Sequence, residues 1–304
     1  MDTSRILIVG ANGQLGKALQ AQYPQAVAVD RDDFDMTDWK FIKNYDWSKI
    51  DIILNAAAYT NVDGAETAEG REAAWKINAT GPGYLSKVAT EHGLVLVHVS
   101  SDYVFDGTKV PHTEDEPYSP LSVYGASKAA GDIAVSATKR HYILRTTWLI
   151  GNGPNFVRTM MGLAAKNISP TVVSDQVGRL TFTPTLVAAI DHLLQSQAWG
   201  GIYNITNSGE SASWADITRQ IFKDLGRDDL TVTNSTTEKY FADKIASGVQ
   251  IAPRPLGSEM SLAKLEATGL QLTDWKSELA TYIDAELASQ TDNEPNTEEV
   301  EEEE

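Results

Sequence analysis

Short apolar runs alternate with longer amphipathic stretches along most of this 304-residue chain. The runs lie at residues 6–9, 26–29, 52–58, 94–99, 143–145 and 202–205. They are rich in Val, Ile and Leu, which is typical of strands that are buried on both faces of a parallel sheet. Strands that alternate with helices predict an α/β fold, a doubly wound parallel sheet with helices on both faces.

A glycine-rich turn ends the first apolar run. Glycines stand at positions 10, 13 and 16, and a helical pattern that includes Leu15 and Leu19 follows. Such a turn lets the backbone approach a ligand closely, and the N-terminus of the next helix can bind a pyrophosphate. The spacing is G-x-x-G-x-x-G rather than the commoner G-x-G-x-x-G, so the turn alone also fits a purely structural role.

An acidic residue and a group of small residues favour the ligand-binding interpretation. Asp30 follows the second run, about 20 residues after the first glycine, where an acid binds the adenosine ribose in dinucleotide-binding folds. The third run ends in Ala56, Ala57 and Ala58, whose small side chains leave room for a cofactor at the sheet edge. The sequence therefore predicts a Rossmann-type domain that binds NADPH or NADH.

A tyrosine and a lysine one helical turn apart form the candidate catalytic pair. Tyr124 and Lys128 share a helix face because they are four residues apart. A neighbouring cation lowers the pKa of a phenol, which suits proton transfer at neutral pH. Ser101 lies upstream at the end of the fourth run, where ligands of open α/β sheets bind.

The same tyrosine–lysine spacing occurs twice more in the chain. Tyr45 precedes Lys49, and Tyr240 precedes Lys244, by four residues. Neither pair accompanies a serine at a strand end, so we expect both to be surface pairs. The context of Tyr124, and not the spacing alone, makes it the candidate.

The second half of the chain is less regular. Helical patterns cover residues 155–166, 184–195, 214–225 and 274–288, and Ser213 is placed to cap the third of them. We expect residues 1–150, with about 184–205, to form the NAD(P)-binding domain. About 151–183 and 206–289 then form a smaller α/β substrate-binding domain, with the substrate in the cleft between the two. Residues 290–304 are polar and end in a run of glutamates, which predicts a disordered acidic tail.

Composition excludes several classes of protein. The chain has no cysteine, which excludes disulfides and thiol nucleophiles, and its five histidines show no metal-ligand spacing. The net charge of −17 argues against nucleic-acid binding, which needs a basic surface. No apolar run reaches the roughly 18 residues that a membrane span needs, and no signal peptide is apparent. We therefore expect a cytoplasmic protein with no metal site and no membrane or nucleic-acid partner.

The motifs together carry a family resemblance. The glycine turn and the Tyr124/Lys128 pair resemble the extended short-chain dehydrogenase/reductase superfamily. Within it, residues 100–107 (SSDYVFDG) and 119–125 (SPLSVYG) resemble the dTDP-4-dehydrorhamnose reductases. Segments 55–63, 145–148, 175–178 and 254–255 extend the resemblance over about residues 5–288. It implies reduction of the 4-keto group of dTDP-6-deoxy-L-lyxo-4-hexulose to dTDP-L-rhamnose, for cell-envelope polysaccharide.

The resemblance also implies roles for individual residues. Tyr124 would donate the proton, Lys128 would hold the nicotinamide ribose and lower the pKa of Tyr124, and Ser101 would hydrogen-bond the carbonyl oxygen. The cofactor-binding residues would be Gly10, Asn12, Gly13, Gln14, Leu15, Gly16, Asp30, Arg31, Asp35, Met36, Ala56, Ala57, Ala58, Tyr59, Thr60, Tyr124 and Lys128. The substrate-binding residues would be Ser101, Asp102, Tyr103, Trp148 and Arg254, with Arg158 as a further cation for the diphosphate. Tyr103 and Trp148 also fit the role of plain core aromatics.

Two positions bear on assembly and on the choice of cofactor. Some members of the family are described as metal-linked dimers that use a glutamate on the helix after the glycine turn, but the matching residue here is Ala18. We therefore expect a monomer or an oligomer that needs no metal. Asp30 favours the free ribose of NADH, whereas Arg31 can pair with the 2′-phosphate of NADPH or be only a surface charge.

Other functions stay open at this point. An epimerase or another reductase of nucleotide sugars would share the fold and the tyrosine. A dehydratase would carry an Asp–Glu pair after the active-site hydroxyl, where this chain has Asp102 and Tyr103, so dehydration is disfavoured. A non-catalytic NADP-binding regulatory subunit would have no need of Ser101, Tyr124 and Lys128 together.

Overall fold

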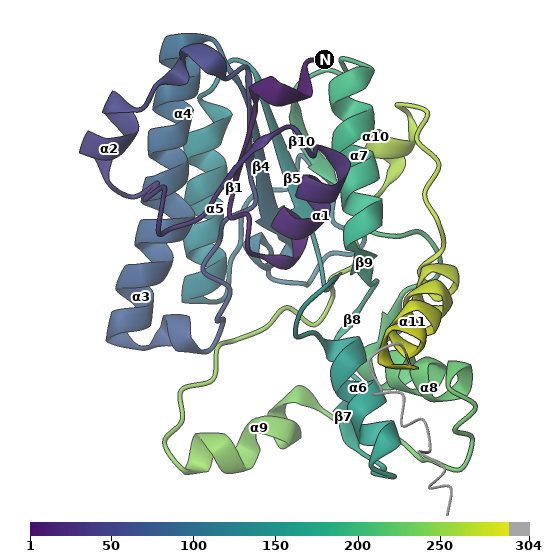
Figure 1. The fold of residues 1–304 in the computed structure, drawn as a ribbon. Coiled ribbons are helices and arrows are strands. Elements are labelled where there is room, and N and C mark those ends of the chain that lie inside the picture. Colours follow the sequence, from purple (N-terminus) through teal and green to yellow (C-terminus); the bar gives the residue numbers. More distant parts are fainter. Residues whose placement is uncertain (292–304) are drawn as a thin grey trace, which may run out of the picture.

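A six-stranded parallel sheet forms the centre of the larger part of the molecule (Figure 1). The computed structural model describes residues 1–291. The strands are β1 (Ile6–Val9), β2 (Val27–Val29), β3 (Ile52–Asn55), β4 (Val95–Ser101), β5 (His141–Thr146) and β10 (Gly201–Asn204). Their order is β10-β5-β4-β3-β1-β2, and every neighbouring pair is parallel. The predicted doubly wound, Rossmann-type sheet is confirmed.

Helices cover both faces of the sheet. Successive residues of a strand point to opposite faces, so each apolar strand contributes side chains to both layers of helices. The helices of this part are α1 (Gln14–Gln22), α2 (Trp39–Asn44), α3 (Ala68–Trp75), α4 (Gly81–His92), α5 (Val123–Ser136) and α7 (Thr183–Gln195). Ile6 and Ile8 of β1 face the core shared with α1 and α7. Leu7 and Val9 face the opposite core, shared with α2, α4 and α5. The inner strands β1 and β3 are therefore shielded from water on both sides, whereas the edge strand β2 is largely exposed.

A smaller group of elements lies below the sheet in Figure 1. Its helices are α6 (Phe156–Ala165), α8 (Trp214–Asp224), α9 (Thr237–Ala246) and α11 (Trp275–Thr291), and α10 (Ala263–Glu266) lies beside β10. Its short strands are β6 (Leu149–Ile150), β7 (Thr171–Val173), β8 (Val177–Gly178), β9 (Thr181–Phe182), β11 (Ala212–Ser213) and β12 (Thr233–Ser235). They pair as β6 with β9, β7 with β12 and β8 with β11.

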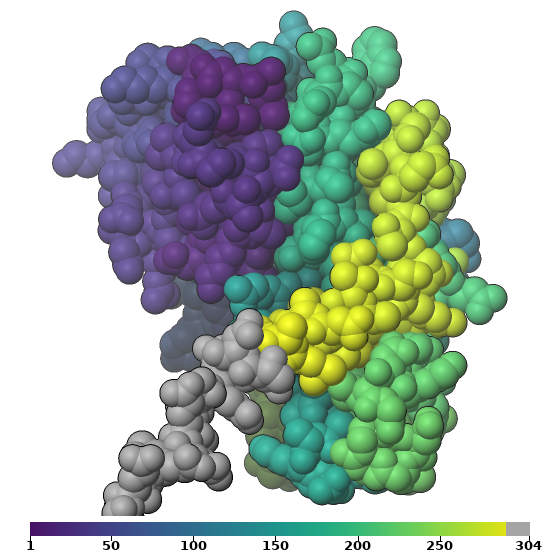
Figure 2. Space-filling view, turned by 45° about the vertical axis from the view of Figure 1, so that its right-hand side comes forward, coloured from purple at the N-terminus to yellow at the C-terminus, as the bar shows by residue number. Residues whose placement is uncertain are grey.

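This smaller group has its own hydrophobic core. Trp275 and Leu279 of α11 pack with Ile217 and Ile221 of α8, and all four side chains are 1% exposed or less. Figure 2 shows α11, in yellow, lying against the green segment that contains α8. Ser213 caps α8 as predicted, and it does so within a capping box, because Ser213 and Asp216 exchange side-chain and backbone hydrogen bonds.

Most predicted helices and strands are found close to their expected bounds. The main correction is at the C-terminal end, where α11 continues past residue 288 to Thr291. Residues 290 and 291 therefore belong to a helix, and the rest of the predicted tail lies outside the described residues. The division into two domains stays a prediction. The buried residues of the smaller group's core, apart from Ile150, lie within the ranges 151–183 and 206–289 that were predicted for the substrate-binding domain.

The parallel sheet brings the candidate residues to one edge. The strand register pairs Val9 with Asn55, and Ser101 with Thr146, so the carboxyl ends of β1, β3, β4 and β5 lie side by side. The glycine turn, the alanines after β3, Ser101 and Trp148 all emerge there. The strand order also reverses between β1 and β3, and ligands of open α/β sheets bind at such switch points.

Candidate active site

Tyr124 and Lys128 lie on the first two turns of α5. Ser122 caps this helix by accepting a hydrogen bond from a backbone N–H of the first turn. The two side chains are buried, at 9% and 1% exposed. The Lys128 ammonium donates a hydrogen bond of 2.6 Å to the carbonyl oxygen of Val99 in β4. This bond fixes the ammonium beside the strand that ends in Ser101.

The phenol of Tyr124 holds its proton firmly. Burial raises the pKa of Tyr124 to about 12, although a hydrogen bond with Ser101 opposes the rise, and the charges of Asp102 and Asp132 add to it. The predicted lowering of this pKa is therefore wrong for the structure, because desolvation of the phenolate outweighs the other effects. A phenol with this pKa stays protonated at neutral pH, which suits a proton donor.

Lys128 belongs to a cluster of buried charged side chains. Asp132 follows it by one turn of α5, and the Asp132 carboxylate lies 3.5 Å from Nε of Arg145 and 3.7 Å from Nε2 of His98. Burial lowers the pKa of Lys128 to about 8, and the charge of Asp132 limits the drop. Burial also raises the pKa of Asp132 and lowers that of His98 well below its ordinary value. The cluster therefore controls how readily Lys128 keeps its charge.

Ser101 makes hydrogen bonds on several sides. Its hydroxyl donates to Oδ1 of Asp102 at 2.9 Å and accepts from the backbone N–H of Tyr103 at 3.2 Å. The other carboxylate oxygen of Asp102 accepts from the Ser258 hydroxyl at 2.6 Å. Asp102 is only 2% exposed. It therefore holds two protein hydroxyls, and its contact with substrate stays a prediction.

Two aromatic residues predicted to bind substrate are placed differently. The Tyr103 ring packs edge-on against Tyr124 with 5.3 Å between centroids. The Trp148 ring stacks on Trp214 of α8 at 3.9 Å, and its backbone φ of 46° lies in the left-handed region, which is costly for a bulky residue. Tyr103 thus contacts the candidate proton donor, while Trp148 joins the sheet edge to the second core. Their contact with substrate stays a prediction.

Asn78 is a residue of the site that no sequence pattern signals. It lies fully buried in a π-helical turn (Lys76–Thr80) between α3 and α4. Its amide oxygen accepts the Tyr59 N–H at 2.8 Å, and its amide nitrogen donates to the Ser127 hydroxyl at 3.0 Å. Asn78 therefore ties the loop after β3 to α5. Such π turns are common at functional sites because they re-aim side chains and backbone groups.

The glycine turn packs directly on the loop that follows β3. A Cβ on Gly10, whose φ is 86°, would lie 2.6 Å from the backbone nitrogen of Ala57. A Cβ on Gly16 would lie 2.1 Å from the carbonyl oxygen of Gly10. Both positions therefore require glycine. Gly13 stands at the N-cap of α1 without a capping side chain, which leaves first-turn N–H groups of the helix for an anionic ligand.

Asp30 holds the glycine turn by its backbone. One carboxylate oxygen accepts the Asn12 N–H at 2.9 Å, and the other accepts the Arg31 N–H at 2.8 Å. The Arg31 side chain is 91% exposed, with its Nε 3.8 Å from the equally exposed carboxylate of Asp32. An exposed guanidinium beside Asp30 is suitably placed for a phosphate group.

The other predicted cofactor residues surround the same turn. Gln14 reaches the loop after β6, where its Nε2 lies 3.4 Å from the Pro154 carbonyl oxygen. Leu15 is buried in the core, so only its backbone is available to a ligand. Asp35 is exposed and accepts hydrogen bonds from Thr37, whereas Met36 is buried. Ala56, Ala57, Ala58 and Tyr59 are half-buried, and Thr60 is exposed.

The two arginines expected to bind the diphosphate have acidic partners. Arg254 donates to both carboxylate oxygens of Asp63, at 2.8 and 2.9 Å, and its guanidinium lies over the Phe241 ring. Arg158 makes a similar two-bond contact with Glu286 of α11, at 2.7 Å each. Both arginines therefore pair with a carboxylate of the protein, and their contact with the diphosphate stays a prediction.

Comparison with known proteins identifies the family. Residues 4–288 match the family model described as the RmlD substrate binding domain. The chain belongs to this family. A dTDP-4-dehydrorhamnose reductase of Mycolicibacterium smegmatis is 34% identical to it, over 95% of this chain and 88% of the relative.

Solved structures of RmlD-family relatives agree with this assignment. A dTDP-4-dehydrorhamnose reductase from Clostridium acetobutylicum is 37% identical, covers 93% of this chain and 99% of its own, and has a TM-score of 0.85. The dTDP-4-dehydrorhamnose reductase of Bacillus anthracis in complex with NADP is 33% identical, covers 92% and 99%, and has a TM-score of 0.83. The similarity therefore extends over nearly the whole of both relatives.

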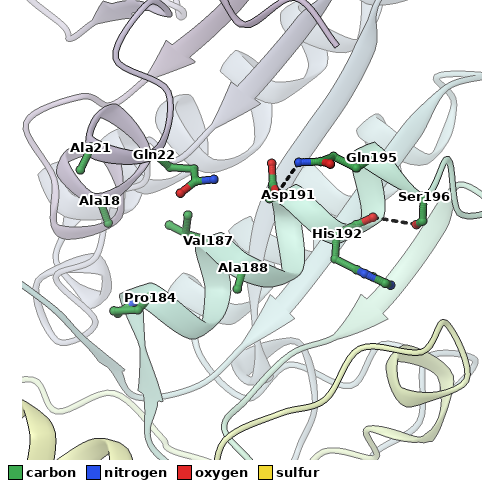
Figure 3. A pocket seen from close by; sticks show the side chains of 10 residues that line it. All are labelled: Ala18, Ala21, Gln22, Pro184, Val187, Ala188, Asp191, His192, Gln195 and Ser196. Atoms are coloured by element: carbon green, nitrogen blue, oxygen red, sulfur yellow. Dashed lines mark hydrogen bonds between the residues drawn. The ribbon is translucent and has the colours of Figure 1, made fainter.

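Ala18 lies on α1 where this helix faces α7. It lines a groove of about 610 Å³ between α1 and α7, together with Ala21, Pro184 and Ala188 (Figure 3). Over residues 1–291, no three His, Asp or Glu side chains are grouped so that they could hold a metal ion. Over the same residues, no helix combines the length and the apolar character that crossing a membrane requires.

Proposed function

We propose that the protein reduces the 4-keto group of dTDP-6-deoxy-L-lyxo-4-hexulose, giving dTDP-L-rhamnose for polysaccharide synthesis. The observation that carries the proposal is the placement of the buried Tyr124 phenol beside Ser101 at the carboxyl ends of the strands. The extent of similarity to two dTDP-4-dehydrorhamnose reductases of known structure supports this choice of substrate.

The residues of the glycine turn fit a nicotinamide dinucleotide. Gly10 and Gly16 bring two backbone segments together where a Cβ would clash, and the uncapped N-terminus of α1 offers N–H groups to the pyrophosphate. Asp30 and Arg31 lie at the end of β2 for the adenosine end. When bound, the cofactor supplies the hydride that reduces the sugar carbonyl.

The chain's own residues handle the proton. Tyr124 donates it to the carbonyl oxygen of the sugar, because burial keeps the phenol protonated at neutral pH. Ser101 lies beside the phenol and opposes part of the rise in the Tyr124 pKa. Lys128 is held by the Val99 carbonyl, which would fix its ammonium for a hydrogen bond to the nicotinamide ribose when the cofactor is bound. A positioned acid of this kind contributes about 10²–10⁴-fold in rate.

The structure supports NADPH as one cofactor that the protein accepts. The Arg31 guanidinium is exposed beside Asp30, and both Asp30 oxygens already accept backbone N–H groups. Asp30 therefore has less capacity left for a ribose diol than a free carboxylate.

The protein also works in the cytoplasm as a monomer or a metal-independent oligomer, without a nucleic-acid partner.

Stoichiometric consumption of cofactor tests the proposal. The purified protein is mixed with the keto-sugar nucleotide, and NADPH absorbance and product are followed together. One NADPH lost for each sugar reduced is the expected result. Turnover of sugar without net NADPH loss would indicate an epimerase, and binding of NADPH without turnover would indicate a regulatory subunit. Tyr124→Phe is the matched control, which should bind NADPH but not reduce the sugar.

A further inference from the structure

A hydrogen-bond chain reaches Ser101 from a distant part of the sequence. Ser258 lies between α9 and α10, 156 residues after Asp102, and donates to Oδ2 of Asp102 at 2.6 Å. Ser101 donates to Oδ1 of the same carboxylate at 2.9 Å. Ser258, Asp102 and Ser101 are 2%, 2% and 7% exposed. Water therefore cannot easily replace either serine as a partner of the carboxylate.

This arrangement restricts the rotation of the Ser101 hydroxyl. An ionised carboxylate only accepts hydrogen bonds, so the Ser101 hydrogen points to Asp102 and the oxygen lone pairs face the other donors. The backbone N–H of Tyr103 is one such donor. Loss of Ser258 would leave one buried carboxylate oxygen without its partner, and Asp102 would turn to find another. The orientation of Ser101 would change with it.

The segment that carries Ser258 is itself anchored to both parts of the molecule. Asp63 lies in the loop after β3, and its Oδ1 accepts a hydrogen bond of 3.0 Å from the Ala252 N–H. The Ser258 N–H donates to the carbonyl oxygen of Val177 in β8 at 2.7 Å. Residues 252–258 thus link the sheet edge to the smaller group of elements. Docking of this segment determines where the Ser258 hydroxyl lies.

We propose that Asp102 and Ser258 are positioning residues that orient the Ser101 hydroxyl for reduction of the sugar. Docking of residues 252–258 therefore contributes to turnover without contact between Ser258 and the substrate. The inference rests on the proposed function, because Ser101 must take part in the reaction for its orientation to matter. Neither residue moves a proton to the substrate.

Steady-state kinetics of Ser258 variants provide the test. Ser258→Ala should lower kcat by about 10²-fold, the loss that a misplaced catalytic group causes. The KM values for sugar and NADPH should stay within about threefold, since no substrate contact is removed. Ser258→Cys keeps a weak donor of similar size and should give an intermediate kcat. Ser261→Ala, in the same stretch but outside the hydrogen-bond chain, should behave as the wild type.

A double-mutant cycle separates this role from general support of the fold. If Ser258 acts through Asp102, the Asp102→Asn/Ser258→Ala variant should be no slower than Asp102→Asn alone. A wild-type kcat in Ser258→Ala, or losses that multiply in the double variant, would overturn the inference. If Ser258→Ala does not fold, Ser258→Cys replaces it in the test. A kcat below that of the wild type supports the inference, and a wild-type kcat overturns it. A wild-type protein that does not reduce the sugar would overturn the proposed function instead.

Discussion

At the scale of single residues, burial decides the protonation state of the candidate catalytic groups. Tyr124 and Lys128 are both desolvated, and this moves their pKa values apart, to about 12 for the phenol and about 8 for the ammonium. Burial disfavours the charged form of each group, so the phenol keeps its proton and the ammonium loses its proton more easily. Asp132 opposes the loss at Lys128, which makes this carboxylate relevant to the pH range of activity.

The pH profile of kcat/KM should reflect Lys128. Lysine is positively charged below its pKa, so an enzyme that needs the ammonium loses activity as the pH rises through about 8. Asp132→Asn removes a charge that raises this pKa, and the alkaline limb should move to lower pH. Asp115→Asn, which changes an exposed carboxylate, is the control and should leave the profile in place. An unchanged limb in Asp132→Asn would show that Asp132 does not support the ammonium.

Cofactor preference should depend on a single exposed side chain. Arg31→Ala should raise the KM for NADPH by about 10- to 100-fold, the value of one charge-assisted hydrogen bond, and leave the KM for NADH unchanged. The melting temperature should not move, since the side chain is 91% exposed. Arg140→Ala, at the amino end of β5 and so on the opposite sheet edge, should change neither KM. Equal effects of Arg31→Ala on both cofactors would place the adenosine end elsewhere.

At the scale of elements, the N-termini of α1 and α8 serve different purposes. The N-terminus of α1 is left without a side-chain cap, in keeping with a ligand there, whereas α8 begins with a complete capping box. The difference follows from the residue at the N-cap, glycine in one helix and serine in the other. The first helix end is adapted to binding and the second to stability.

Ser213→Ala should destabilise the smaller group of elements. The change removes the capping hydrogen bonds of a buried helix, and the free energy of unfolding should fall by about 0.5–2 kcal/mol in a denaturant titration. Thr236→Ala is the matched control, because Thr236 caps α9 and this helix has no buried residues. Its loss should be below about 0.5 kcal/mol. Equal losses would mean that α9 contributes to the core as much as α8.

At the scale of the whole molecule, the sheet and the smaller group are joined by polar contacts near the site. Arg254 and Asp63 form a two-bond ion pair across this boundary, with side chains 14% and 36% exposed. The Asp102–Ser258 hydrogen bond crosses it as well. The relative placement of the two parts is therefore set by groups that also lie beside the candidate active site.

Substitutions at the ion pair should reveal a structural role for Arg254. Arg254→Ala and Asp63→Ala should each lower the melting temperature slightly, and the double variant should lower it no further. The KM for the sugar nucleotide should change by less than about threefold in Arg254→Ala. A much larger rise in that KM, with no loss of melting temperature, would show that Arg254 contacts the substrate.

The sequence predicts the sheet well because its strands are continuous apolar runs with glycine and alanine at their ends. The glycine turn, Ser101 and the Tyr124/Lys128 helix are local patterns and are found where the fold requires them. The partners of Arg254 and Asp102 could not be predicted, because Asp63 and Ser258 are remote in sequence. Asp132 could have been predicted from the sequence, since it continues the four-residue spacing of Tyr124 and Lys128.

The most direct test of the central claim follows one atom. The protein is incubated with the keto-sugar nucleotide and NADPH that carries deuterium at the reactive position of the nicotinamide, and the product is examined by NMR and mass spectrometry. The account predicts one deuterium at C4 of the sugar, in a product with the rhamno configuration, and no such product with Tyr124→Phe. A product without deuterium at C4, or equal product from Tyr124→Phe, would contradict it.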